Sequence, residues 1–166
     1  NYFHRALSIQ SDFFPAQHAL AMMYEDMDDT PRSDSLFLHM IHQNNNDAVG
    51  QNDYAYILSE REESSTEELQ YALELAENAI NIEPDNPAFL DTIGWIYYKL
   101  GTYQIAEEYL KKSLNINNNN PVILEHLGDI YLKLNKSADA VNIYEKVLSI
   151  DSDNQLIKDK IDKIYE

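Results

Sequence analysis

The residues of this chain that could support metal chemistry are few. His39 and His42 lie three positions apart on one predicted helix, with Asp34 and Asp47 nearby in the sequence. Imidazole and carboxylate groups bind zinc, but such a site needs about four ligands at suitable spacings. No further ligand follows at a convincing spacing, so we expect no metal site.

Acid–base and nucleophilic chemistry are equally poorly supported. Three pairs of adjacent glutamates could supply general acids and bases: Glu62-Glu63, Glu67-Glu68 and Glu107-Glu108. They fall in predicted loops or on exposed helix faces, where solvated charge explains them. The chain has no Cys, no Gly-rich phosphate loop and no nucleophile motif. We therefore expect a protein that is not an enzyme and needs no cofactor.

The charge of the chain is strongly negative and uneven. The formal net charge is −17, and residues 1–86 carry 17 acidic side chains against 3 Arg, whereas residues 87–166 carry 12 against 9 Lys. Such a field repels nucleic-acid phosphates and anionic membranes and favours a basic partner near the N-terminal half. Solubility of a helical surface is the alternative explanation. No stretch reaches the roughly 20 apolar residues that cross a bilayer, so we expect no membrane insertion.

Amphipathic helices are the elements that position these side chains. Between residues 87 and 100, apolar side chains recur at spacings of three and four, which predicts one helix with a single buried stripe. A second helix is predicted over residues 103–116, and Gly101 separates the two. The two helices would form an antiparallel pair.

The same pattern recurs 34 residues later. Residues 93–106 read IGWIYYKLGTYQIA, and residues 127–140 read LGDIYLKLNKSADA. Gly94 aligns with Gly128, and Ala106 with Ala140, which predicts small residues where the two helices of a unit cross closely. A fixed period of roughly 20–50 residues indicates stacked units rather than one globular core.

This pattern resembles the tetratricopeptide repeat (TPR) family. The matching positions are Leu90, Ile93, Gly94, Tyr97, Gly101, Tyr103, Ala106, Leu110 and Leu114, and then Leu124, Leu127, Gly128, Tyr131, Ala140, Tyr144 and Leu148. The Pro that usually closes each unit is replaced by Asn118 and Ser152. The resemblance implies an all-α fold, a right-handed α-solenoid of stacked antiparallel helix pairs.

The resemblance also implies a division of the chain. Residues 1–13 would be the second helix of a truncated preceding repeat, and residues 155–166 a C-terminal capping helix. The four repeats between them would span residues 14–47, 48–86, 87–120 and 121–154. The second repeat fits only if about five extra residues near 62–66 lengthen the loop between its helices. Because the chain starts without Met and in mid-repeat, we expect it to be part of a longer protein.

In the TPR family the first helix of each unit lines a concave groove that binds proteins or peptides. The groove residues implied here are His18, Met22, Asn52, Tyr56, Asp91, Trp95, Tyr98, Lys99, Glu125, His126 and Asp129. Trp95 lies two residues after the core position Ile93, so we expect it to be exposed as a binding hot spot beside Tyr98 and facing Tyr56. The alternative is that Trp95 packs against neighbouring helices or against a chain terminus that fills the groove.

The expected partner is a protein or peptide that combines basic side chains with an apolar anchor. Some TPR domains bind a C-terminal carboxylate through Lys, Arg and Asn side chains in the groove. This sequence departs from that pattern, because Met22, Asp53 and Asp91 occupy or adjoin the positions of those donors. We therefore do not expect a receptor for acidic tails.

Three functions remain open from the sequence. The first is a non-catalytic scaffold that holds a partner in the groove, and the second is the interaction segment of a larger enzyme, such as a glycosyltransferase. The third is a self-associating module, a homodimer formed through the orphan N-terminal helix with Phe3, Ala6, Leu7 and Ile9. Cytoplasmic and periplasmic locations are both open.

Overall fold

The computed structural model describes residues 13–165, and all regular structure in that range is helical. In chain order the helices are α2 (Phe14–Asp26), α3 (Thr30–Gln43), α4 (Ala48–Glu60), α5 (Thr66–Ile82), α6 (Pro87–Lys99), α7 (Tyr103–Ile116), α8 (Pro121–Lys133), α9 (Ser137–Ile150) and α10 (Gln155–Tyr165). None of these described helices is both long and apolar enough to cross a membrane. The helix predicted over residues 1–13 and the homodimer contact predicted there lie, apart from Phe13, outside the described residues.

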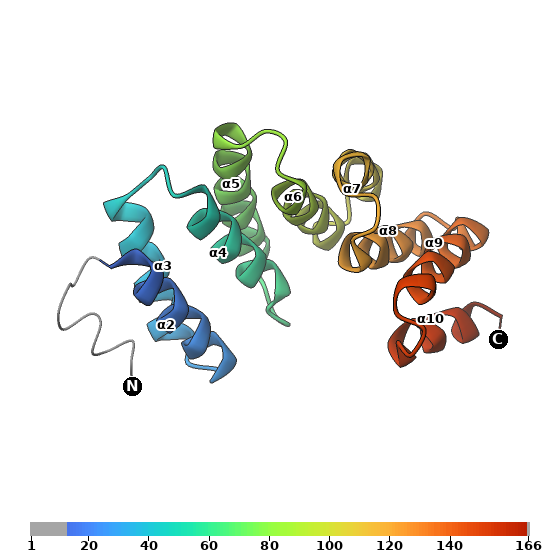
Figure 1. The fold of residues 1–166 in the computed structure, drawn as a ribbon. Helices are drawn as coiled ribbons and strands as arrows, with labels where there is room; N and C mark the ends of the chain where they lie inside the picture. Colours follow the sequence, from blue (N-terminus) through green and yellow to red (C-terminus); the bar gives the residue numbers. More distant parts are fainter. Residues whose placement is uncertain (1–12, 166) are drawn as a thin grey trace.

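The helices form a curved row of antiparallel pairs. Helix α2 pairs with α3, α4 with α5, α6 with α7 and α8 with α9, and α10 packs on α9 (Figure 1). The first helices α4, α6 and α8 also contact one another in turn. Within the described residues, the second helices α5, α7 and α9 do not contact one another to the same degree as the first helices do. The first helices therefore lie on the inner side of the curve.

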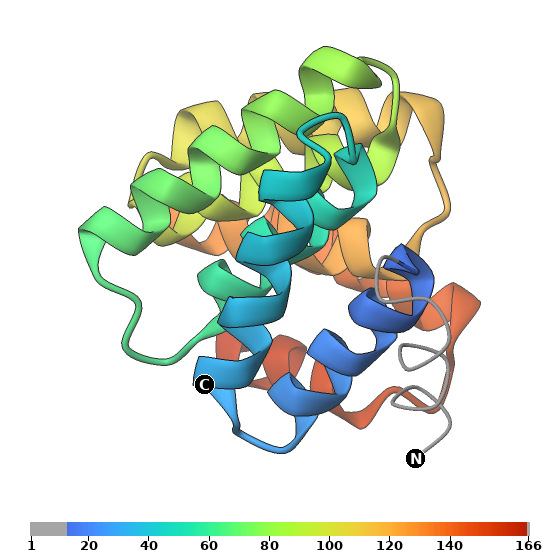
Figure 2. The same cartoon turned by 90° about the vertical axis from the view of Figure 1, so that its left-hand side faces the viewer.

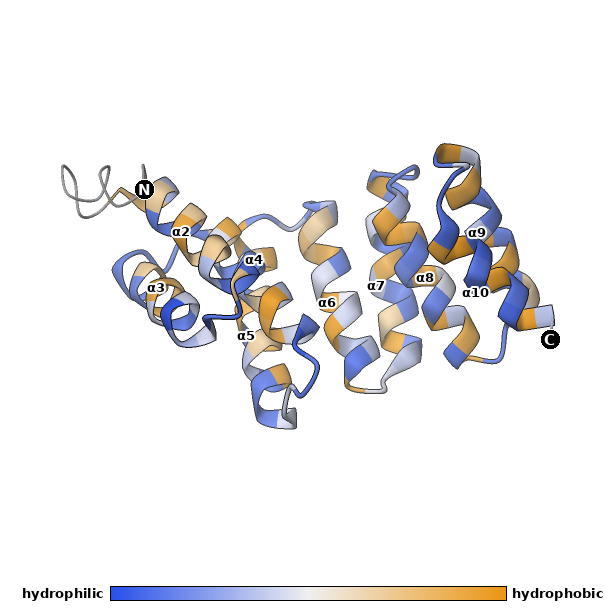
Figure 3. Cartoon of the chain, turned by 90° about the horizontal axis from the view of Figure 1, so that it is seen from below, coloured by the Kyte–Doolittle hydropathy of each residue, from blue (hydrophilic) through white to orange (hydrophobic). Residues whose placement is uncertain are grey.

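The predicted all-α, right-handed solenoid is confirmed. Figure 2 looks along the row from its N-terminal end, with α2 and α3 in front and the later helices turned behind them. Each helix pair lies within one of the four predicted repeats, which supports that division as a proposal. Seen from below, hydrophilic loops join helices on which apolar and polar residues are interleaved (Figure 3).

The core is filled by residues from the helix crossings. One buried cluster contains Phe37, Tyr54 and Leu58, and a second contains Leu110 and Tyr144. A Cβ atom at Gly94 would collide with the side chain of Leu110, and one at Gly128 with the ring of Tyr144. The close approach of the helices supports the prediction of small residues at the crossings of the third and fourth pairs.

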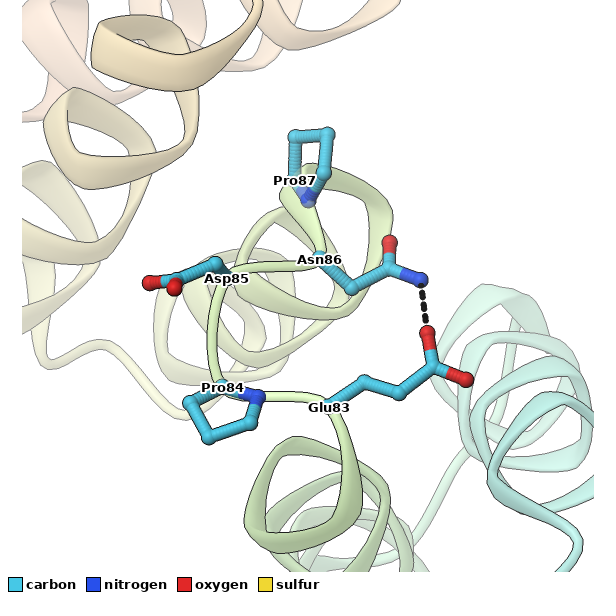
Figure 4. A pocket seen from close by; sticks show the side chains of 5 residues that line it. All are labelled: Glu83, Pro84, Asp85, Asn86 and Pro87. Atoms are coloured by element: carbon cyan, nitrogen blue, oxygen red, sulfur yellow. Dashed lines mark hydrogen bonds between the residues drawn. The ribbon is translucent and has the colours of Figure 1, made fainter.

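The turns before α6 and α8 share the same capping pattern, an Asn side chain followed by Pro. In the turn between α5 and α6, the side chain of Asn86 accepts a hydrogen bond from the Ala88 N–H at 3.0 Å, while its Nδ2 donates to Glu83 Oε2 at 2.8 Å (Figure 4). Pro87 then occupies the first helical position, where its missing N–H has no consequence. Residues 83–87 line a hollow of about 480 Å³ made by this turn alone. It therefore belongs to the helix-capping structure.

The exit from α4 differs from the exits of the other first helices. After α2, α6 and α8 the chain passes through a left-handed residue, at Asp28, Gly101 and Asn135 respectively, which stops the helix and reverses direction. After α4, Arg61 is instead extended, with φ −59° and ψ 136°. The chain therefore leaves this helix outwards and needs more residues to return.

Those additional residues are divided between a loop and a helix, which corrects the prediction of a longer loop alone. Residues 61–65 form the connection, and α5 has 17 residues where α3, α7 and α9 have 14. Ser65 and Glu68 bond to each other's backbone N–H in a capping box, which starts α5 about one turn early. Of the residues predicted for the longer loop, near 62–66, Thr66 is the first residue of this helix.

Candidate protein-binding face

The inner face, formed by α2, α4, α6 and α8, is held together by polar contacts in one repeated register. The fifth residue of a first helix contacts the sixth residue of the next, and the two lie 35 positions apart. The pairs are His18 with Asp53 at 2.7 Å, Asp91 with His126 at 2.9 Å, and Glu125 with Lys160 of α10 at 2.8 Å. Each pair joins an acidic to a basic side chain, so the register is electrostatically matched.

The junction between α4 and α6 is the exception to this register. The equivalent positions, the fifth of α4 and the sixth of α6, hold Asn52 and Thr92, and both residues are buried. The Asn52 Nδ2 donates to Asp53 Oδ1 at 3.3 Å, and Thr92 donates to the Ala88 carbonyl of its own helix. This junction instead uses the indole N–H of Trp95, which donates to Glu60 at 2.6 Å.

Trp95 is buried, so the prediction of an exposed tryptophan is wrong. Its side chain is 8% exposed, and its ring stacks on Tyr98 at 4.6 Å and on His126 at 4.1 Å between centroids. The Nζ atom of Lys99 lies 5.3 Å from the centre of the same ring. The position is off the core stripe of α6, as predicted, but α8 covers it. The alternative interpretation, packing against neighbouring helices, is the one observed.

The C-terminal part of the face is closed by the chain itself. The Lys160 ammonium group lies within 2.8 Å of Glu125 and of both Asp129 oxygens, and the Tyr144 hydroxyl donates to Asp129 at 2.6 Å. Burial alone would lower the pKa of Lys160, but the hydrogen bonds and charges of the two carboxylates raise it. Lys160 is not among the predicted groove residues, although its distance of 35 residues from Glu125 was a usable signal.

The N-terminal part of the face contains a cleft of about 520 Å³ between α2 and α4. Met22, Tyr56 and Ile57 supply its apolar surface. Five carboxylates also line it: Glu25, Asp26, Asp28, Glu60 and Glu62. We call this the acidic cleft. Of the predicted groove residues, the structure brings Met22 and Tyr56 together here.

Arg61 lies at one side of the acidic cleft and was not predicted as a site residue. Its guanidinium group donates to both oxygens of Glu25, each at 3.1 Å, and to Asp34 at 2.7 Å. Burial alone would lower the pKa of Arg61, but the bonds to Glu25 and Asp34 raise it. The equivalent capping residues of α2, α6 and α8 are Met27, Leu100 and Leu134. A charged residue where the other units have an apolar one was the signal in the sequence.

The surrounding carboxylates raise the pKa values of ionisable groups on the inner face. The hydrogen bond that His18 donates to Asp53 raises the pKa of His18 above its ordinary value of 6.5, although burial opposes the shift. Burial, and then the negative charges of Glu60, Asp91 and Glu125, raise the pKa of Tyr56 to about 12. The N-terminal part of the face is therefore a negative environment that favours cations.

The comparison with protein families gives one match. The model of the family described as anaphase-promoting complex, cyclosome, subunit 3 matches residues 65–147, half of the chain. Those residues cover α5 to α8 and most of α9, with the repeated helix pairs and glycine crossings described above. The chain belongs to the tetratricopeptide repeat family. A comparison of this TPR chain with curated proteins finds no match.

Solved structures of other TPR proteins share the fold. The chain is 20% identical to TTC0263 of Thermus thermophilus, with a TM-score of 0.84 over 98% of this chain and 87% of that one. It is 20% identical to PilW, a type IV pilus biogenesis factor, with a TM-score of 0.85 over 98% and 75% of the two chains. For the Cut9–Hcn1 hetero-tetramer of the APC/C, the identity is 15% and the TM-score 0.85, over 99% of this chain and 32% of that one.

The remaining candidate of the TPR chain was the histidine pair on α3. His39 and His42 are both exposed, and no group of three His, Asp or Glu side chains suited to a metal ion occurs within residues 13–165. The candidate site of this TPR protein is therefore its inner face.

Proposed function

We propose that this TPR chain is a non-catalytic protein–protein interaction scaffold. It holds a basic, partly apolar segment of a partner protein against its inner face. The proposed groove residues remain those predicted from the sequence, but the buried ones now have a structural role and the accessible ones the role of contacting the partner. Trp95, Asp91, Asn52 and His126 are buried and shape the face, whereas the exposed Met22 and the half-buried Tyr56 and Tyr98 offer direct contacts.

The observation that carries this proposal is the cross-helix register of the inner face. Side chains bonded from α2 to α4, from α6 to α8 and from α8 to α10 hold neighbouring repeats in fixed positions. A surface already ordered before binding loses little conformational entropy when a partner arrives. The net charge of the chain is negative, and the excess of acidic residues lies mainly in its N-terminal half.

Support for a protein partner also comes from the fold. The Cut9–Hcn1 structure is that of a protein assembly, and its TPR chain superposes on this one. The acidic charge disfavours nucleic acid, because phosphate groups would be repelled. The inner face therefore fits a polypeptide better than another polyanion.

Site-specific photo-cross-linking in the source cells would test this function. A photoreactive phenylalanine analogue replaces Tyr56 or Tyr98 on the inner face, and Tyr71 on α5 serves as the matched aromatic control. We expect cross-links to a partner protein from Tyr56 and Tyr98 but not from Tyr71. Cross-links from Tyr71 alone, or from none of the three positions, would contradict the proposal.

A further inference from the structure

We propose that the acidic cleft binds a Lys or Arg side chain of the partner together with the apolar residue beside it. This inference rests on the proposed function and specifies the chemistry of the partner. The cleft has a volume of about 520 Å³, within the range of roughly 300–1,000 Å³ typical of ligand pockets. Four of its residues, Met22, Glu25, Tyr56 and Glu60, lie on the inner face.

The apolar part of the cleft suits an aliphatic stem. Met22 is 37% exposed, Tyr56 is half-buried, and Ile57 is buried. Lys and Arg side chains bury their methylene groups on such surfaces while the charged end stays near water or a carboxylate. An unbranched thioether such as that of Met22 adapts to different apolar neighbours.

The charge of the cleft is not balanced by the part of the chain that the structure describes. Of the five carboxylates, Glu25 is paired with Arg61, and Glu60 with Trp95 and Lys99. Within the described residues, the side chains of Asp26, Asp28 and Glu62 form no ion pair or hydrogen bond. Three carboxylates therefore remain free beside an apolar surface, which is the complement of a cation on an aliphatic stem.

Arg61 shows that this part of the molecule can hold a cation. Its guanidinium group binds Glu25 in a bidentate arrangement, the geometry that makes Arg–carboxylate pairs strong. Arg61 is paired with Glu25 and Asp34, which leaves Asp26, Asp28 and Glu62 to an incoming side chain. The cleft thus already contains one cation site and has charge for a second.

The irregular second repeat builds this cleft. Arg61 and Glu62 line it because the chain leaves α4 in an extended conformation, whereas α2, α6 and α8 end in a left-handed turn. Insertions in repeat proteins map to loops on one face, which is often the binding face. The regular third and fourth repeats have no such loop, because only three residues follow α6 and α8 before the next helix begins.

The experiment is an NMR titration of the full chain with short blocked peptides. The probe is acetyl-Gly-Leu-Lys-Gly-amide, and the matched control peptide has Gln in place of Lys. The variant D26N/D28N/E62Q removes the three free carboxylates and should fold, because Asn tolerates the left-handed conformation of residue 28. The control variant E77Q/E108Q/E145Q removes the same charge from exposed positions on α5, α7 and α9.

We expect the Lys peptide to shift the amide signals of Met22, Ile57 and Arg61. Loss of the ligand cation, or of the three carboxylates, should weaken binding about tenfold, and the control variant should bind nearly as tightly as the native chain. Equal affinities for the Lys and Gln peptides, shifts outside the cleft, or an equal loss in both variants would overturn the inference. Continued cross-linking from Tyr56 and Tyr98 would then leave the proposed function standing, and its absence would remove both.

Discussion

The two halves of the inner face use the same register in opposite ways. His18 and Asp53 near the N-terminal end are 31% and 32% exposed in their side chains, whereas Asp91 and His126 are 10% and 9% exposed. The two pairs occupy equivalent positions, with the acid and the base exchanged. One pair therefore lies beside open surface, and the other is part of the packed interior.

The difference comes from what lies above each pair. In the C-terminal half, Trp95 covers His126 and stacks on Tyr98, and Lys160 of α10 closes over Asp129. In the N-terminal half, His18 instead lines an open hollow of about 310 Å³. The acidic cleft, with the exposed Met22, lies further along the same two helices. Equivalent positions in a repeat can thus be packed inside in one unit and open to solvent in another. We expect substitutions to separate the halves accordingly.

The largest effect should follow replacement of Trp95 by alanine. The change removes two ring stacks and the bond to Glu60 from a buried site, and we expect a loss of about 3–5 kcal/mol in the free energy of unfolding. Urea unfolding followed by circular dichroism would measure it. The comparison variant Tyr56→Ala, at a half-buried position beside the cleft, should lose clearly less. Equal losses would contradict the distinction between the halves.

The helix crossings should show the next largest effect. Gly94→Leu forces a side chain into Leu110 and the Ala106 backbone, and we expect a destabilisation of about 1–3 kcal/mol or more from overpacking. The equivalent residue of α4 is Ala55, which is fully buried, and Ala55→Gly should cost only about 1 kcal/mol through helix propensity. An unchanged midpoint of thermal unfolding for Gly94→Leu would refute the assignment of this crossing.

The two polar pairs give a direct test of burial. Asp91→Asn leaves a buried imidazole without its charged partner, and we expect a loss of about 1–3 kcal/mol. Asp53→Asn at the more exposed pair should cost no more than about 1 kcal/mol. Chemical denaturation of both variants under the same conditions compares them. A larger loss for Asp53→Asn would reverse the proposed order.

The smallest effect is the titration of His18. Its folded-state pKa lies above 6.5, so the stabilisation by Asp53 is fully present below pH 6.5 and disappears as the pH rises through the folded-state pKa. The C2 proton of His18 should therefore titrate above 6.5 in NMR spectra. In Asp53→Asn the midpoint should fall, and an unchanged midpoint would exclude Asp53 as the main cause.

The sequence predicted the fold well because helix pairs depend on local periodicity. Spacings of three and four around Ile93 and the 34-residue period from Gly94 to Gly128 are sufficient to predict α6, α7, α8 and α9. The start of α5 was less predictable, because the capping box of Ser65 and Glu68 competes with a loop interpretation of the same residues.

The candidate site was only partly predictable, because exposure depends on contacts between repeats. Periodicity shows that Trp95 lies off the stripe of its own helix but not that His126 of the next first helix covers it. The acidic cleft depends on the backbone direction after Arg61, which no residue pattern revealed. By contrast, the link between Glu125 and Lys160 could have been found by comparing charges 35 residues apart.

The hydrogen bond between Glu60 and Trp95 makes the fluorescence of Trp95 sensitive to the curvature of the helix row. It crosses the junction of α4 and α6, where the neighbouring Asn52 and Thr92 make no bond across the junction. Flattening or tightening of the row would stretch this contact and admit water to the indole ring. Because Trp95 is the only tryptophan in the chain, its emission maximum would report that bending without any added label.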